Sequence, residues 1–151
     1  MKIAHQIKIK VFSYEKDDEY QNSALEKLLQ LIPFNAKDEK IALNRTEAQG
    51  FNEKKITIFE IILEKERHTS KFLEKLINNL NEHQKNIILE QLENRLDEKL
   101  SFFLRFDKAE YIKNNRLVLT DSGNCFHIEI SVAAFPRKRD VAIKSIKKLF
   151  S

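Results

Sequence analysis

Apolar and polar residues alternate along several stretches of the chain, beginning near its start. In residues 3–12 isoleucine and valine side chains on one side alternate with Gln6, Lys8 and Lys10, which is typical of a half-buried strand. Between Ile56 and Leu63 both sides of the alternation are apolar, which predicts a strand covered on both faces. Similar patterns predict further strands at Lys40–Glu47, 101–106, 116–120 and Phe126–Ala133.

Four other stretches have the spacing of amphipathic helices. The first covers residues 17–32 and ends at Pro33, which cannot continue a helix. Thr69 and Asn81 have the side chains preferred at helix N-caps. They predict two consecutive helices, the second running to about residue 97, which form a helical hairpin. Pro136 is expected to open a final helix that ends at Phe150.

We expect turns at residues 107–115 and 121–124, which gives the element order β-α-β-β-α-α-β-β-β-α. This order predicts an α+β fold with a mostly antiparallel sheet and helices packed on one face. The chain has 151 residues and contains no repeat or low-complexity linker. We therefore expect a single domain over residues 1–151.

Composition removes several classes of function. Cys125 is the one cysteine, and it is expected to be a small buried residue. The four histidines lie in separate predicted elements, and two glycines cannot form a glycine-rich phosphate loop. No apolar run of 18 residues and no apolar signal region is present. We expect a cytoplasmic protein without a metal, a cofactor or contact with a membrane.

Charge is distributed unevenly along the chain. Residues 1–12 carry three lysines and no acidic side chain, and residues 101–151 carry 10 basic and 5 acidic residues. The middle, residues 13–100, has 14 basic and 18 acidic residues. If the two ends meet in the fold, they form a positive face suited to a polyanion. The alternative is an ordinary surface of mixed charge.

Three charged residues follow one another at the end of the predicted strand 101–106. Arg105, Asp107 and Lys108 admit three interpretations. They form a structural ion pair, or the arginine presents its planar guanidinium to a phosphate or a base edge, or Asp107 and Lys108 form a catalytic pair. Phe103 shares a strand face with Arg105, where it either stacks on an unpaired base or belongs to the core.

A second basic segment stands at the start of the predicted final helix. Arg137, Lys138 and Arg139 oppose the helix dipole there, and three lysines follow on the same helix. This pattern fits either a phosphate-binding surface or an exposed helix face. Lys8 and Lys10 would join the surface if the first strand lies beside the strand Phe126–Ala133.

With these residues in view, the chain resembles a family of small archaeal proteins described as RNA-binding domain proteins or predicted exosome subunits. The resemblance extends over nearly the whole length. Its most specific part is Arg95-Leu-Asp97 followed about ten residues later by Phe103-Leu-Arg-Phe-Asp-Lys108. Other matching segments are His5–Phe12, Glu15–Glu19, Glu47–Gly50, Ile56–Leu63, Leu117–Asp121 and Phe126–Ile128.

The resemblance implies a fold similar to that of the large-subunit ribosomal protein that binds 5S RNA. It also implies RNA binding without catalysis, in a role linked to RNA processing or degradation. Two departures concern loops that would touch RNA. Relatives tend to have a second glycine and a proline after Gly50, and an acidic residue at the position of Asn124.

Our leading hypothesis is therefore a non-enzymatic RNA-binding protein, associated with the exosome or another RNA-processing complex. The alternative is a protein-interaction or assembly subunit, such as a homodimer, without direct RNA contact. A nuclease would need clustered carboxylates, for which Asp97, Asp107 and Asp121 are the candidates. The residues expected to contact RNA are Arg105, Lys108, Arg137, Lys138 and Arg139, supported by Lys8 and Lys10.

Overall fold

The computed structural model describes residues 2–14, 18–49 and 55–151, and it has an α+β fold. The predicted helix start at residue 17 and the loop after Gly50 lie outside these residues. Within the described residues the strands are β1 (Ala4–Ser13), β2 (Leu43–Gln49), β3 (Lys55–Leu63), β4 (Ser101–Asp107) and β5 (Cys125–Val132). The helices are α1 (Asp18–Leu31), α2 (Glu66–Asn78), α3 (Glu82–Glu90), α4 (Leu92–Arg95), α5 (Lys108–Asn114) and α6 (Arg139–Phe150).

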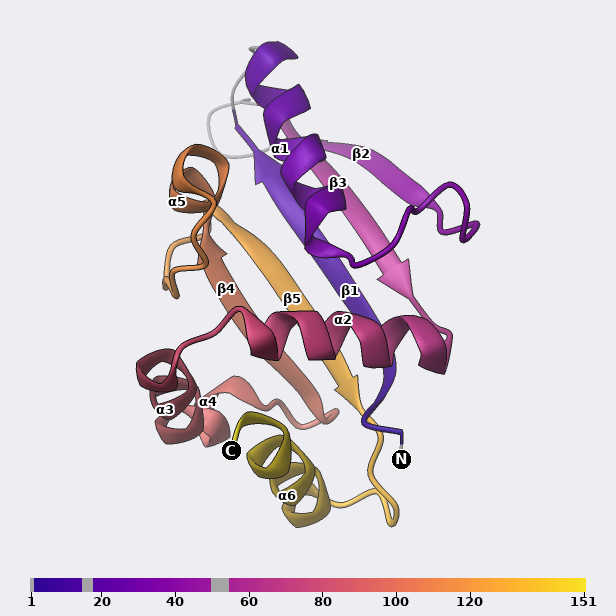
Figure 1. Ribbon diagram of the computed structural model, residues 1–151, viewed down its shortest axis with the longest axis vertical. Coiled ribbons are helices and arrows are strands. Elements are labelled where there is room, and N and C mark those ends of the chain that lie inside the picture. Colours follow the sequence, from indigo (N-terminus) through magenta and orange to yellow (C-terminus); the bar gives the residue numbers. More distant parts are fainter. Residues whose placement is uncertain (1, 15–17, 50–54) are drawn as a thin grey trace. The chain divides into compact units, whose positions relative to one another are not determined.

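The strands form one sheet in the order β2-β3-β1-β5-β4. Neighbouring arrows point in opposite directions in Figure 1, and β2 pairs with β3 antiparallel, with Leu43 opposite Ile61 and Gln49 opposite Lys55. The predicted antiparallel α+β fold is therefore confirmed. Every residue of β2 is exposed, in keeping with its place at the edge of the sheet.

The chain divides into two compact units, and four of the strands contribute residues to both. The first unit comprises Met1–Ile7, Leu63–Leu104 and Glu129–Ser151, and the second unit comprises Lys8–Ile62 and Arg105–Ile128. The expectation of a single domain stays a prediction.

The second unit is built on the alternation of apolar residues in its strands. Ile9 and Val11 of β1 are fully buried, whereas the lysines on either side of Ile9 are half-buried. Helix α1 lies over β1 and β3 (Figure 1) and buries Ala24 and Leu28 completely. Tyr111 packs edge-to-face on Phe126, with ring centroids 5.3 Å apart. This packing leaves the other strand face to polar side chains.

The first unit combines helices α2, α3, α4 and α6 with the remaining strand segments. Phe72, Leu73 and Leu76 form the buried side of α2, as its amphipathic spacing predicts. Helix α6 contacts α3 and α4, and its Phe150 ring lies 5.9 Å from the ring of Phe102 in β4. Cores of this kind are stabilised by about 25 cal/mol for each square ångström of apolar surface removed from water.

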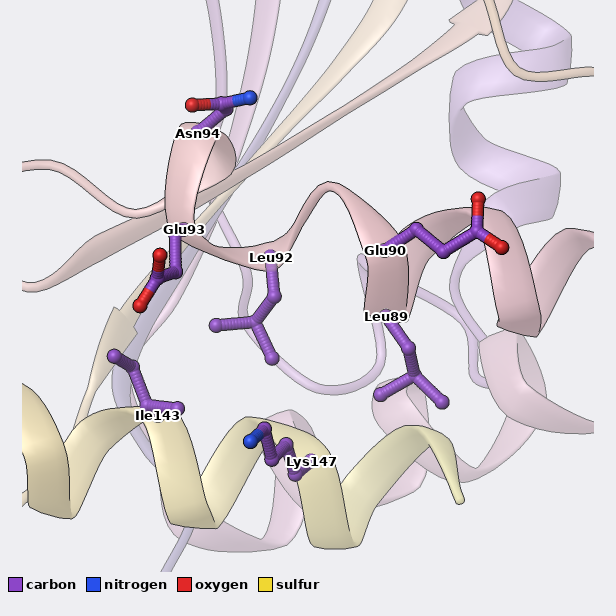
Figure 2. A pocket seen from close by; sticks show the side chains of 7 residues that line it. All are labelled: Leu89, Glu90, Leu92, Glu93, Asn94, Ile143 and Lys147. Carbon is purple, nitrogen blue, oxygen red and sulfur yellow. The ribbon is translucent and has the colours of Figure 1, made fainter.

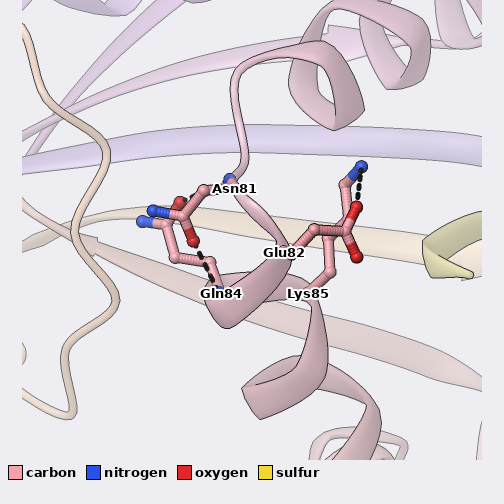
Figure 3. Close-up of polar contacts among 4 residues, drawn as sticks. All are labelled: Asn81, Glu82, Gln84 and Lys85. Carbon is pink, nitrogen blue, oxygen red and sulfur yellow. Dashed lines mark hydrogen bonds and ion pairs between the residues drawn. The ribbon is translucent and has the colours of Figure 1, made fainter.

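The predicted cap at Asn81 is present (Figure 3). Its side chain accepts a hydrogen bond from the Gln84 backbone N–H at 2.8 Å, and the Gln84 side chain accepts one from the Asn81 N–H at 3.0 Å. This capping box satisfies two backbone donors at the start of α3. Figure 3 also shows the ion pair between the half-buried Lys85 and the exposed Glu82, with Nζ and Oε1 3.9 Å apart.

Two helix predictions are wrong in their limits. Thr69 is not an N-cap, because α2 already begins at Glu66 and the Thr69 hydroxyl donates to the Glu66 carbonyl. The helix predicted to run from Asn81 to about residue 97 is broken at Gln91 and ends before Leu96. Leu96 is extended and pairs with Phe102 of β4, so tertiary pairing outweighs the local helical pattern.

The segment after β4 also differs from the prediction. Residues 108–114 form helix α5 in place of a turn, because the Asp107 side chain caps the Glu110 N–H at 2.9 Å. The predicted strand 116–120 is reduced to one bridge between Phe106 and Leu119. Cys125 is buried, as expected. The final helix starts at Arg139 and not at Pro136, since Lys138 is extended.

Candidate nucleic-acid interface

Arg105 projects from the polar side of β4 in the second unit. Leu104 and Phe106 are fully buried, whereas Arg105 between them is exposed. Its Nη1 donates to the Asp121 carbonyl at 3.2 Å, and its own carbonyl accepts from the Thr120 N–H at 3.0 Å. No carboxylate of the described residues pairs with it, so the guanidinium is oriented by a backbone contact and keeps its charge available.

Asp107 and Lys108 do not form the ion pair or the catalytic pair considered from the sequence. The Asp107 carboxylate accepts the N–H of Glu110 at the start of α5. The Lys108 ammonium points elsewhere and donates to the Phe12 carbonyl at 2.8 Å. Arg105, Asp107 and Lys108 therefore have three separate tasks in the fold.

Lys108 corrects the expectation of a surface contact. It has 0% relative exposure, and its Nζ lies 5.5 Å from the centre of the Tyr14 ring. A buried ammonium needs a hydrogen-bond acceptor, and the carbonyl and the aromatic face both favour its positive charge. Because its charged group is enclosed, Lys108 links the end of β1 to the start of α5.

Three neighbouring strands of the second unit bring further polar groups to the face that carries Arg105. Lys10 of β1 is half-buried, and its Nζ lies 3.3 Å from Glu60 Oε2 of β3. Lys8 on the same strand is also half-buried. His127 of β5 has a lowered pKa, first because burial disfavours the imidazolium and then because Arg105 and Lys10 repel it. We call Lys10, Arg105 and His127 the sheet-face cluster.

The second basic segment lies in the first unit, directly before and at the start of α6. Arg137 Nη2 donates to the Lys99 carbonyl at 3.2 Å, and the side chain stays exposed. Lys138 is exposed and extended at the N-cap position of α6. Arg137 and Lys138 thus remain candidates for phosphate contacts. The expectation that Lys8 and Lys10 join them in one positive face stays a prediction.

Arg139 is engaged within the first unit. Its guanidinium donates to the carbonyls of Glu93 at 2.8 Å and Leu96 at 3.0 Å. These carbonyls belong to the end of α4, which lacks intrahelical donors for them. Arg139 therefore acts as a C-terminal cap on α4 while its side chain stays exposed, and its expected contact with RNA stays a prediction.

Phe103 and Phe135 are the aromatic residues that bear on base stacking. Phe103 is half-buried, and its carbonyl accepts from Arg95 Nη1 at 3.2 Å. Phe135 is 81% exposed, in the loop between β5 and α6. Phe135 was not among the residues predicted to contact RNA. Its position directly before a proline and three basic residues, at the end of an alternating strand, is the signal that marks it as a loop aromatic.

A cleft of 320 Å³ lies between the α3–α4 segment and α6 in the first unit. Figure 2 shows Leu89, Leu92 and Glu93 directed towards α6, from which Ile143 and Lys147 project. Its polar lining residues are Glu90, Glu93, Asn94 and Lys147, and the other lining residues are leucine and isoleucine.

Metal-dependent chemistry has no assembled site in the part of the chain that is described. No three His, Cys, Asp or Glu side chains there could hold a metal ion together. Asp97 accepts the backbone N–H groups of Lys99 and Ser101, so it orders a turn. Within the same residues, no helix is long and apolar enough to cross a membrane.

Comparisons with known proteins agree with these features. A family model described as RNA binding matches residues 6–132. The RNA-binding protein PAB1135 of Pyrococcus abyssi is 27% identical over 146 residues, which cover 96% of this chain and 92% of that protein.

Solved archaeal structures have the same fold. Mth689, a DUF54 protein of Methanothermobacter thermautotrophicus, is 28% identical with a TM-score of 0.77, and the match covers 99% of both chains. Protein AF2318 of Archaeglobus fulgidus has a TM-score of 0.84 at 23% identity, covering 97% of this chain and 99% of that one.

Proposed function

The chain belongs to the RNA-binding family, and from this premise we propose that it is a non-catalytic RNA-binding protein. The observation that carries the proposal is the exposed guanidinium of Arg105, held by the Asp121 carbonyl and by no carboxylate of the described chain. An arginine has five N–H donors, so one backbone contact orients it and leaves several for phosphate or a base edge. Preorganised donors of this kind lose little side-chain entropy on binding.

Two groups of residues would contact RNA. In the second unit these are Arg105, with Lys8 and Lys10 as supporting cations. In the first unit they are Arg137 and Lys138, which are exposed beside the start of α6. Lys108 and Arg139 support the interface indirectly, because each fixes backbone next to one of these groups.

We place this activity in RNA processing or degradation, in association with the exosome. The support is the resemblance carried by Arg95-Leu-Asp97 and Phe103–Lys108. An accessory subunit needs to hold RNA and need not cleave it. The association predicts that exosome subunits purify with the tagged protein and remain bound after nuclease treatment. If they are lost with the RNA, the link is through RNA alone.

The test of RNA binding is a fluorescence-anisotropy titration of a labelled single-stranded RNA and a structured RNA. We expect binding at about 50 mM salt that weakens at about 200 mM, because neutralised phosphates release counterions. Substituting Arg105→Ala should reduce the slope of log K against log salt by about 0.7, the value for one phosphate of a single strand. Failure of both RNAs to bind at low salt would exclude the proposal.

Arg45→Ala is the matched control. Arg45 is an exposed arginine on edge strand β2, where it contacts Glu47 at 3.8 Å and the Phe59 ring at 5.6 Å. Its substitution removes the same charge outside the proposed interface and should leave the salt slope unchanged. Equal losses in both variants would mean that net charge, and not the geometry around Arg105, governs binding. A protein that keeps its protein partners but never binds RNA would be the assembly subunit considered from the sequence.

A further inference from the structure

Phe135 is the most exposed large apolar side chain among the described residues, at 81%. Single apolar residues on a surface are common and need no explanation. Phe135 differs because buried residues precede it: Ala133 and Ala134 are only 6% and 4% exposed. The chain therefore leaves the core and immediately presents a phenyl ring to solvent.

The loop that carries Phe135 is held on both sides. Before it, the Ala133 N–H donates to the Ile3 carbonyl at 2.8 Å. After it, the Lys138 N–H donates to the Pro136 carbonyl at 2.8 Å, and the Arg137 side chain donates to the Lys99 carbonyl at 3.2 Å. An aromatic ring on a fixed loop loses little entropy when it contacts a ligand.

One neighbour of the ring is already an aromatic residue. The His5 ring contacts Phe135 edge-to-face, with centroids 6.1 Å apart and an interplanar angle of 80°. His5 is itself exposed. The contact restrains the phenyl ring, and its high exposure leaves most of its surface accessible to a flat partner.

Charge distinguishes the kinds of partner. Arg137 and Lys138 follow Phe135 after a single proline, and both are exposed; Asp140 is the acidic residue that partly offsets them. A nucleotide has a flat base and an adjacent anionic phosphate, so it matches a ring flanked by cations. An apolar pocket on another protein would match the ring alone.

From these features we propose that Phe135 is a stacking platform for an unpaired base of single-stranded RNA, with Arg137 and Lys138 contacting the flanking phosphates. The inference rests on the proposed RNA-binding function and adds the site and the form of RNA that it recognises. It lies entirely within the first unit, whereas Arg105 belongs to the second unit.

The first experiment substitutes Phe135→Trp. The chain contains no tryptophan, so the new indole is the single reporter of this position. Stacking predicts that single-stranded RNA quenches its fluorescence, while a fully paired duplex of the same sequence has little effect because its bases are already stacked. Equal quenching by both, or none by either while the RNA binds, would overturn the inference.

The second experiment compares Phe135→Ala with Leu43→Ala. Loss of one base–aromatic stack should weaken binding of single-stranded RNA about 5- to 150-fold, with little change for the duplex. Leu43 is 38% exposed on β2 in the second unit, and its substitution should leave RNA affinity unchanged. Since Phe135 is exposed, the thermal unfolding of the variant should match that of the parent protein.

The outcomes separate the two proposals. If the parent protein binds neither RNA, the proposed function fails and this inference fails with it. If the parent protein binds and Phe135→Ala binds equally well, only the stacking platform is wrong.

Discussion

Lys108 carries an ammonium group into the interior of the second unit, where the Phe12 carbonyl and the Tyr14 ring receive it. A buried lysine is rare because removing its charge from water is costly. Here the carbonyl links the end of β1 to the start of α5, which gives the charge a structural task. Arg139 does similar work in the first unit by bonding the final carbonyls of α4.

We predict that Lys108→Ala lowers the free energy of unfolding by about 2–5 kcal/mol. The substitution leaves a cavity and removes the donor to the part-buried Phe12 carbonyl. Denaturant unfolding followed by circular dichroism measures the change. Lys113→Ala is the control, because Lys113 is an exposed lysine in the last turn of the same helix; surface changes of this kind stay within about 0.5 kcal/mol.

The same pair of variants tests the assignment of Lys108 to the interior. At temperatures where both variants are folded, Lys108→Ala should not change the salt slope of RNA binding. A reduced slope with unchanged stability would return Lys108 to the RNA-contacting residues and contradict its observed burial.

At the scale of elements, local signals decide where several helices start. Asn81 and Gln84 cap α3 reciprocally, and Asp107 caps α5. The sequence Asp107-Lys-Ala-Glu110 has the spacing of a capping motif, so α5 was available from sequence although we expected a turn there. The ends of helices depend more on residues that are distant in sequence: α4 ends where Leu96 pairs with Phe102.

We predict that Asn81→Ala lowers the free energy of unfolding by about 1 kcal/mol, since it leaves the Gln84 N–H without its capping acceptor. The comparison is Asn86→Ala, an exposed position within the same helix, where alanine has the higher helix propensity and stability should be kept or slightly raised. Urea unfolding of both variants shows whether the loss of stability is specific to the N-cap position or follows the removal of any asparagine from this helix. Equal losses would show that the cap contributes nothing.

At the scale of the whole molecule, His127 of the sheet-face cluster makes the free energy of unfolding depend on pH. Burial and the cations Arg105 and Lys10 hold the pKa of His127 below its ordinary value of 6.5. Above that value His127 is neutral in both states and contributes no pH dependence. As the pH falls below it, the unfolded chain binds a proton before the folded protein does, so stability decreases.

We therefore predict that unfolding free energy, measured in urea between about pH 8 and about pH 5.5, declines on the acidic side of the ordinary histidine value. His127→Gln should make this decline shallower, because the group that takes up the proton is removed. An unchanged slope in the variant would mean that other groups carry the pH dependence. Bound RNA phosphate near Arg105 and Lys10 should reduce the repulsion and raise the pKa of His127.

Sequence patterns alone were enough to predict the α+β class, the antiparallel sheet and the resemblance to an RNA-binding family. They also placed β1, β3, β4 and β5 to within one or two residues at most ends. Alternation and helical spacing are periodic over many residues, so they record which faces are buried.

The folded chain fixes the surroundings of each cation. Arg105, Lys108 and Arg139 are all basic residues next to element boundaries, yet Lys108 is buried, whereas Arg105 and Arg139 are exposed and Arg139 also donates to the carbonyls of Glu93 and Leu96. Their tasks depend on acceptors such as the Phe12 and Glu93 carbonyls, which lie far away in sequence. A pattern of neighbouring residues in the sequence cannot identify such an acceptor, because only folding brings it within hydrogen-bond distance of the cation.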